Sequence, residues 1–138
     1  MKLKYRKLNW QYEVTEDLFE PTKIKPKEDI LTRLVQLHSD GQLIVGEDFA
    51  WDGASGPTLP WKSSVRPSAV HDAVYGLIAA GLLDKKWRLT ADNMFYRMLR
   101  EDGMPRIQAM SWWLAVRMFG GGSHIETKPE KDIVYESP

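Results

Sequence analysis

Cysteine is absent from the 138-residue sequence. Its absence excludes disulfide bonds, a thiol nucleophile and cysteine-ligated zinc, and it leaves the redox compartment open. An excess of charge of either sign is also lacking, because 19 basic residues balance 19 acidic ones. The balance gives no electrostatic reason to expect nucleic acid or an anionic membrane as an obligatory partner, although it permits local charged patches.

Long apolar runs are lacking as well. No stretch approaches the ~20 apolar residues of a membrane-spanning helix, and the basic N-terminus lacks the apolar centre of a signal peptide. We therefore expect a soluble protein that is synthesised in the cytoplasm. The length fits one domain, which we assign to residues 1–122, and residues 123–138 read as a polar tail without periodicity.

Tryptophan, by contrast, is abundant, with six residues in the chain. Trp112 and Trp113 are adjacent, and neighbours on a helix point about 100° apart, so both cannot face one core. We expect one of them to be half-buried against the sheet or to face a partner or lipid. A tryptophan-rich surface and the C-terminal tail are the predicted contacts with a partner.

The N-terminal part of the chain predicts β-structure. Alternating apolar and polar residues favour strands, and proline confines a segment to a sheet edge. Asp40 and Gly41 match a tight hairpin turn, in which we expect both residues to have positive φ. The predicted strands are residues 4–14, 18–25 as an edge strand or extended connector, 34–37, 43–45 and 49–51.

The C-terminal part predicts three helices, at residues 67–83, 89–101 and 105–119. Proline suits the first turn of the first and third helices, and three glycines end the third. Thr90 is the expected N-cap of the second helix, which places Asp92 in its first turn. The expected inward stripe of the third helix is Ile107, Met110, Leu114 and Met118. Small antiparallel β-hairpins followed by three helices make an α+β fold.

A loop rich in Gly, Ser and Pro runs into the first helix, which carries His71 and Asp72. His71 and Tyr75 are one helical turn apart and share a face, so the tyrosine hydroxyl can reach the same group that the imidazole contacts. Asp92 follows at a distance that allows a turn and an antiparallel second helix. The sequence therefore predicts a helix pair in which the Asp92 carboxylate lies within hydrogen-bonding distance of the His71 ring.

A histidine held by a carboxylate is the arrangement of a general base. The acid fixes the tautomer, while the other ring nitrogen takes a proton from water. His71, Asp92 and Tyr75 are therefore the candidate catalytic residues. Two other interpretations stay open, because the pair can be a buried polar contact between helices and Asp92 can be only a helix cap.

A metal site is a second possibility at the same place. Asp72 points about 100° away from His71 and can bind a hard cation together with carbonyl groups of the loop. A lesser hypothesis adds His38 to His71, Asp72 and Asp92 as ligands of an HD-type metal phosphohydrolase. It is the weaker one because His38 falls in the predicted hairpin and not on the helices.

Four motifs together resemble a family of uncharacterised phage and prophage proteins. They are Asp-Gly-Ala-Ser-Gly-Pro at 52–57, His-Asp-Ala-Val-Tyr at 71–75, Ala-Asp-Asn-Met-Phe at 91–95 and Trp-Leu-Ala-Val-Arg-Met-Phe-Gly at 113–120. The resemblance covers about residues 30–120. It implies a phage setting, in the host cytoplasm or in the virion, with other phage structural proteins as partners.

The two helix motifs also resemble enzymes of the phospholipase A2 type, including the short cysteine-free version found in parvovirus capsids. In these enzymes a glycine loop precedes H-D-x-x-Y, and a second helix begins with A-D-x-x-F. The resemblance covers about 45 residues. It implies that His71 is the general base, Asp92 its orienting carboxylate and Tyr75 a supporting residue, and that phospholipid is the substrate.

Calcium is the cofactor that this second resemblance implies. Asp72 would match the calcium-binding aspartate, and Gly53 and Ser55 would supply ligands from the loop. The loop itself reads Asp-Gly-Ala-Ser-Gly-Pro, where the enzymes have Y-x-G-x-G.

Two classes of function follow. The protein is either a virion or assembly-associated component, in which the His/Asp pair joins two helices, or an active phage hydrolase that acts on the host envelope with His71 as its base. The loop difference and the lack of a secretion signal favour the first class. The joint presence of His71, Asp72, Tyr75 and Asp92 favours the second.

Overall fold

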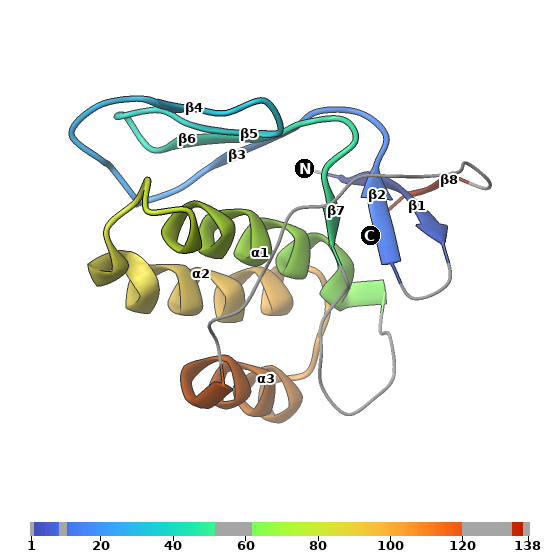
Figure 1. Ribbon diagram of the computed structural model, residues 1–138. Helices are drawn as coiled ribbons and strands as arrows, with labels where there is room; N and C mark the ends of the chain where they lie inside the picture. The colour runs from blue at the N-terminus through green and yellow to red at the C-terminus, as the bar shows by residue number, and fades with distance from the viewer. Residues whose placement is uncertain (1, 9–10, 52–61, 120–133, 137–138) are drawn as a thin grey trace.

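The computed structural model describes residues 2–8, 11–51, 62–119 and 134–136. Two small antiparallel sheets precede three helices, which confirms the predicted α+β fold. Figure 1 shows the three helices stacked in layers below one of the sheets, with the other sheet beside them. The last of the three helices is the outermost layer.

The first sheet is built mainly from the N-terminus. It contains β1 (Lys4–Leu8), β2 (Gln11–Val14), β7 (Ala50–Trp51) and β8 (Val134–Glu136), in the order β7-β2-β1-β8. The run at residues 4–14, predicted as one strand, is thus a hairpin of two strands. The chain reversal brings Tyr5, Tyr12 and Trp51 together, with ring centroids 5.5 Å apart for the tyrosines and 5.4 Å for Tyr12 and Trp51. The imperfect alternation along this run reflects the reversal.

Residues 134–136 lie in the segment expected to be a tail, yet they form β8. This strand pairs with β1, placing Tyr135 opposite Tyr5. Three residues are too short a run for periodicity to reveal, so the pairing could not be read from the sequence.

The second sheet contains β3 (Leu18–Pro21), β4 (Ile30–Leu31), β5 (Val35–Leu37) and β6 (Gln42–Val45), in the order β3-β6-β5-β4. The predicted edge strand is confirmed as β3, and the predicted hairpin as β5 and β6. Gly41 has a φ of 98°, but Asp40 does not have the positive φ that we expected. Instead, the Asp40 carboxylate accepts a hydrogen bond from the Gln42 N–H at 2.9 Å, so only one residue of this longer turn needs left-handed backbone.

Replacing Gly41 by alanine is expected to destabilise the protein by about 2 kcal/mol or more. The residue has positive φ, and an added Cβ would lie 2.3 Å from the backbone oxygen of Thr22. The matched control is Gly81→Ala, where φ is +78° and nothing lies within 4 Å of the added atom. This control should lose only about 1 kcal/mol of folding free energy, because alanine there meets an unfavourable backbone conformation but no steric overlap. Urea unfolding of both variants measures the difference, and equal losses would show that the Thr22 segment moves aside.

The helical part begins with a short 3-10 helix, η1 (Lys62–Ser64), which leads into α1 (Val65–Ala79). This helix starts two residues before the predicted boundary and ends four residues early. Gly81 follows with left-handed backbone, a common way for helices to end. Most of α1 is buried, because the second sheet covers one side and the next helix covers another.

A second 3-10 helix, η2 (Lys85–Trp87), leads into α2 (Arg88–Glu101). Thr90 is therefore inside the helix, and the predicted N-cap is wrong. Asp84 caps the preceding turn instead, where its carboxylate accepts a hydrogen bond from the Lys86 N–H at 2.7 Å. Asp92 consequently lies beyond the first turn of α2, so the helix dipole is not what holds its charge.

The third helix, α3 (Arg106–Phe119), packs on α2 through a small core separate from the main one. This core consists of Phe95, Leu99, Met104, Ala109 and Trp112. The predicted inward stripe is wrong, because Ile107, Met110, Leu114 and Met118 are exposed. The helix is apolar on two faces, and the sequence does not indicate which of them meets α2; the large indole of Trp112 fills the interface.

The adjacent tryptophans separate as expected, but they pack on a helix and not on the sheet. Trp112 is buried, and Trp113 is half-buried with its indole N–H donated to Asn93 at 2.9 Å. Trp51 is buried too, so the four tryptophans in the described residues do not form an exposed cluster. Among the residues described, no helix is both long and apolar enough to cross a membrane.

Arg66, in the first turn of α1, connects three elements. Its guanidinium donates to Glu20 of β3 at 2.8 Å, to both carboxylate oxygens of Asp102 at 2.9 and 3.0 Å, and to Glu101 at 3.1 Å. The start of α1 therefore lies beside the end of α2, which makes the two helices antiparallel. This cluster orients the helix that carries His71.

Candidate functional site

The predicted helix pair is present, and its polar residues meet. His71 Nε2 lies 2.6 Å from Oδ1 of Asp92, and the Tyr75 hydroxyl donates to the same oxygen at 2.6 Å. His71 and Tyr75 come from successive turns of α1, as the spacing required. The predicted contact between His71 and Asp92 is thus confirmed.

Arg117 of α3 completes the group and was not predicted. Its Nη1 lies 2.6 Å from Oδ2, the second oxygen of Asp92. Asp92 is fully buried, whereas the Arg117 side chain is 31% exposed. The arginine belongs to the Ala-Val-Arg motif of the third helix, but nothing in a single sequence connects that motif to an aspartate on another helix. Asp92 therefore links all three helices.

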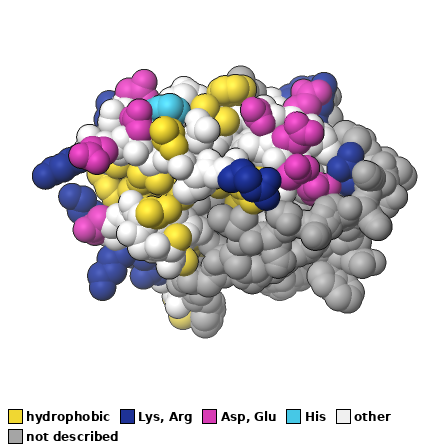
Figure 2. Space-filling model, turned by 45° about the horizontal axis from the view of Figure 1, so that its top comes forward, with side chains coloured by type: hydrophobic (Ala, Val, Ile, Leu, Met, Phe, Trp, Pro, Cys, Tyr) yellow, Lys and Arg dark blue, Asp and Glu magenta, His cyan; other side chains and the backbone are white. Residues whose placement is uncertain are grey.

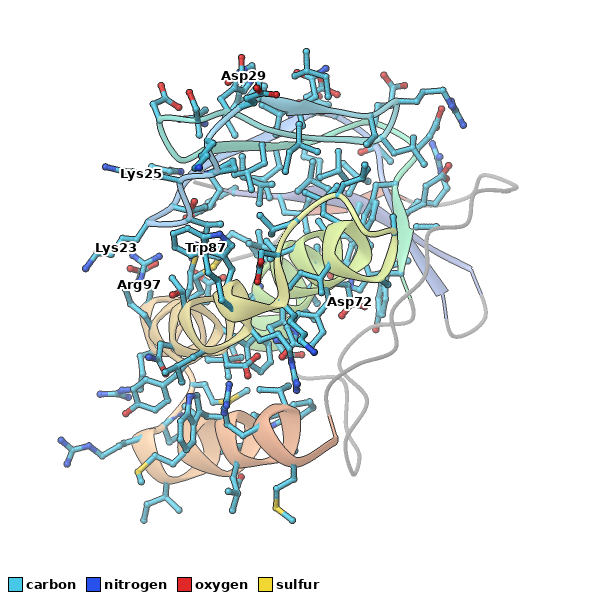
Figure 3. All side chains as sticks on the ribbon, turned by 60° about the vertical axis from the view of Figure 1, so that its left-hand side comes forward. Lys23, Lys25, Asp29, Asp72, Trp87 and Arg97 are labelled. Carbon is cyan, nitrogen blue, oxygen red and sulfur yellow. The ribbon has the colours of Figure 1, made fainter. Side chains whose placement is uncertain are left out.

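The His71 ring is enclosed by aromatic groups. Its centroid lies 4.1 Å from that of Tyr75 and 4.8 Å from that of Phe95, and the residue is only 5% exposed. Its second nitrogen, Nδ1, lies 3.9 Å from Oδ1 of Asp72. Asp72 is the more accessible residue, with 26% of its side chain exposed. Asp72 is labelled in Figure 3.

The electrostatics of the group follow from burial and from its carboxylates. Burial lowers the pKa of His71, but the hydrogen bonds and charges of Asp72 and Asp92 raise it by more, so the pKa lies above its ordinary value. Burial raises the pKa of Asp92, but bonding to His71, Tyr75 and Arg117 outweighs this and lowers it. Burial and the bond to Asp92 raise the pKa of Tyr75 to about 12, so the phenol stays a donor.

The contribution of His71 and Asp92 to stability should therefore be greatest between about pH 4 and pH 6.5, between the ordinary pKa values of Asp and His. The raised pKa of His71 gives a contribution that is complete below pH 6.5 and is lost as pH rises through the folded-state pKa. The lowered pKa of Asp92 gives one that is present above pH 4 and is lost as pH falls through its folded-state value. Urea midpoints across the pH range test this. His71→Gln should remove the decline on the alkaline side, and an unchanged decline would contradict the assignment.

The calcium ligands expected from the sequence are brought together only in part. Gly53 and Ser55 lie outside the described residues, and Asp72 is placed beside His71. Calcium takes six to eight oxygen ligands. The described residues contain no group of three or more acidic or histidine side chains able to hold a metal ion, so they do not by themselves fit such a site. Asp72 as a calcium ligand stays a prediction.

His38 lies away from this group, in the turn of the second sheet. Its Nδ1 is 3.4 Å from Oδ2 of Asp29, an exposed pair. The four ligands of the HD-type hypothesis, which included His38, are not assembled within the described part of the chain.

Comparisons with known proteins add no relatives. No family model matches the chain, and no curated protein and no solved structure matches it either. The chemistry of the site has to be judged from its geometry. A carboxylate that fixes one imidazole nitrogen, with a protonated phenol as its second donor, can stabilise an imidazolium and so support proton abstraction at the other nitrogen.

Proposed function

We propose that the protein is a phage hydrolase that cleaves acyl esters of the phospholipid type, with His71 as general base. One observation carries the proposal: His71 and Tyr75 both meet a single oxygen of the buried Asp92 at 2.6 Å. The sequence resemblance assigns these three residues to one catalytic group, and their convergence supports that assignment. The phage setting rests on the resemblance alone.

In the proposed reaction, Nε2 of His71 donates to Asp92, which leaves Nδ1 to accept the proton of a water molecule. The water oxygen attacks the ester carbonyl carbon, and the proton moves to Nδ1. Asp92 stabilises the imidazolium that forms, and Arg117 and Tyr75 hold Asp92 in place. Collapse of the tetrahedral intermediate breaks the bond to the alcohol oxygen, which takes the proton back from Nδ1.

The test is hydrolysis of a short-chain phosphatidylcholine, below and above its micellar concentration, with and without calcium. His71→Gln should lower the rate at least about a hundredfold, the usual contribution of a general base. His38→Gln is the matched control, since His38 pairs with Asp29 outside the group, and it should keep full activity. Wild-type protein that releases no fatty acid under any of these conditions would end the enzyme proposal.

The second candidate is a virion or assembly component that has no catalytic activity. The contact of Arg117 with Asp92 favours it, because a buried carboxylate bonded to groups from two other helices is also a structural link. Under this alternative the wild type is inactive and His71→Gln loses about 1 to 3 kcal/mol of stability. The ester assay on the wild type therefore distinguishes the two candidates, while thermal unfolding measures the structural contribution of His71 under either of them.

A further inference from the structure

The outer face of α3 is an apolar stripe with no cover from the helix below it. Ile107 is 82% exposed, Met110 52%, Leu114 52% and Met118 63%. They recur at intervals of three or four residues and so lie along one face of the helix. Figure 3 shows side chains of α3 pointing away from α2. Four large apolar side chains in one exposed row exceed the scattered exposure that is normal on a protein surface.

The charged residues of α3 itself are both positive. Residues 105–124 contain no Asp or Glu, while Arg106 and Arg117 lie on one edge of the stripe, on the same side as Trp113. Arg117 is paired with the buried Asp92, so the exposed Arg106 is the cation of α3 that can meet a partner. Although the net charge of the whole chain is zero, residues 105–124 form a basic segment. The outer face of the second sheet differs: Phe19 and Leu31 are exposed there too, but side chains of both charges, acidic ones included, lie around the apolar ones (Figure 2).

We propose that α3 is a membrane-docking helix, which binds an anionic lipid bilayer through this stripe. A convex helix face fits a flat bilayer, into which Ile, Leu and Met can insert while Arg106 at the edge meets the head groups. A half-buried tryptophan at the margin suits the same boundary. A second copy of the chain fits less well, since α3 has no acidic residue to pair with the arginine that a second α3 would bring to the contact. The inference rests on α3 alone and needs no catalysis.

The test is co-sedimentation of the full chain with vesicles of diether phosphatidylcholine, alone or with about one quarter diether phosphatidylglycerol. Diether lipids contain no acyl ester, so binding is measured without hydrolysis. The wild type should bind the anionic vesicles and release them as salt rises. The double variant Ile107→Gln/Leu114→Gln should lower the partition coefficient about tenfold or more. Arg106→Gln should weaken binding to anionic vesicles only.

The matched control is Phe19→Gln/Leu31→Gln, which removes two exposed apolar side chains from the other face. It should bind like the wild type. The proposal is overturned if the wild-type protein stays in the supernatant. It is also overturned if the control variant loses as much vesicle binding as the α3 double variant. Sedimentation equilibrium tests whether a second copy of the chain covers the stripe instead. A wild-type dimer that the α3 double variant abolishes would assign the stripe to that contact. Failure to bind vesicles leaves hydrolysis of monomeric lipid unaffected, so the two proposals fail separately.

Discussion

Asp92→Asn is expected to cost about 3 kcal/mol of folding free energy, the lower end of the range for breaking a buried ion pair. The carboxylate is fully buried and accepts from His71, Tyr75 and Arg117. An amide keeps the shape but loses the charge and one acceptor. The loss should stay near the lower limit because the neighbours adapt: Arg117 can turn toward solvent, and His71 can release its proton. The free energy of unfolding from urea titration measures the effect.

The matched control is Asp29→Asn. Asp29 also pairs with a histidine, but its 3.4 Å contact with His38 is exposed. Exposed pairs contribute about 1 kcal/mol or less, so this variant should remain near wild-type stability. The Asp92 variant should also lower the pKa of His71, which an NMR titration of the ring protons detects. A variant as stable as the control, with the imidazole pKa unchanged, would show that Asp92 does not hold the three helices together.

The His71, Tyr75 and Asp92 group could be predicted because its geometry is mostly local. Residues four apart on a helix share a face, and a short connection between two helices makes them antiparallel. These two rules place Asp92 opposite His71 without any knowledge of the rest of the fold. The same rules could not place Arg117, because its contact depends on the angle at which α3 packs on α2.

Two of the errors have a common physical origin in tertiary packing. The exposed row from Ile107 to Met118 has the periodicity of a core-facing stripe. The row faces outward because Trp112, on another side of the helix, packs against α2. The pairing of residues 134–136 with β1 joins opposite ends of the chain, which no local pattern encodes. The error at Thr90 has a more local cause: a cap there would begin the helix at residue 91, but the 3-10 turn at Lys85–Trp87 leads into a helix that begins three residues earlier, at Arg88.

Arg66→Met is expected to have the largest effect, a loss of about 3 to 5 kcal/mol. Arg66 is 3% exposed and pairs with Glu20 and with Asp102, whose side chains are each 7% exposed. Methionine fills similar volume, so the loss arises from charge and hydrogen bonding. Two buried carboxylates are left without their cation, and the start of α1 loses its contacts with both β3 and α2.

The matched control for this prediction is Arg97→Met. Arg97 pairs with Glu101 at 3.6 Å, with both side chains about half exposed, and such a pair contributes about 0.5 kcal/mol or less. Adding Glu20→Gln to Arg66→Met should recover part of the loss at neutral pH, because it removes one unpaired charge. If Arg66→Met unfolds no more easily than Arg97→Met, the position of α1 depends on its apolar packing alone.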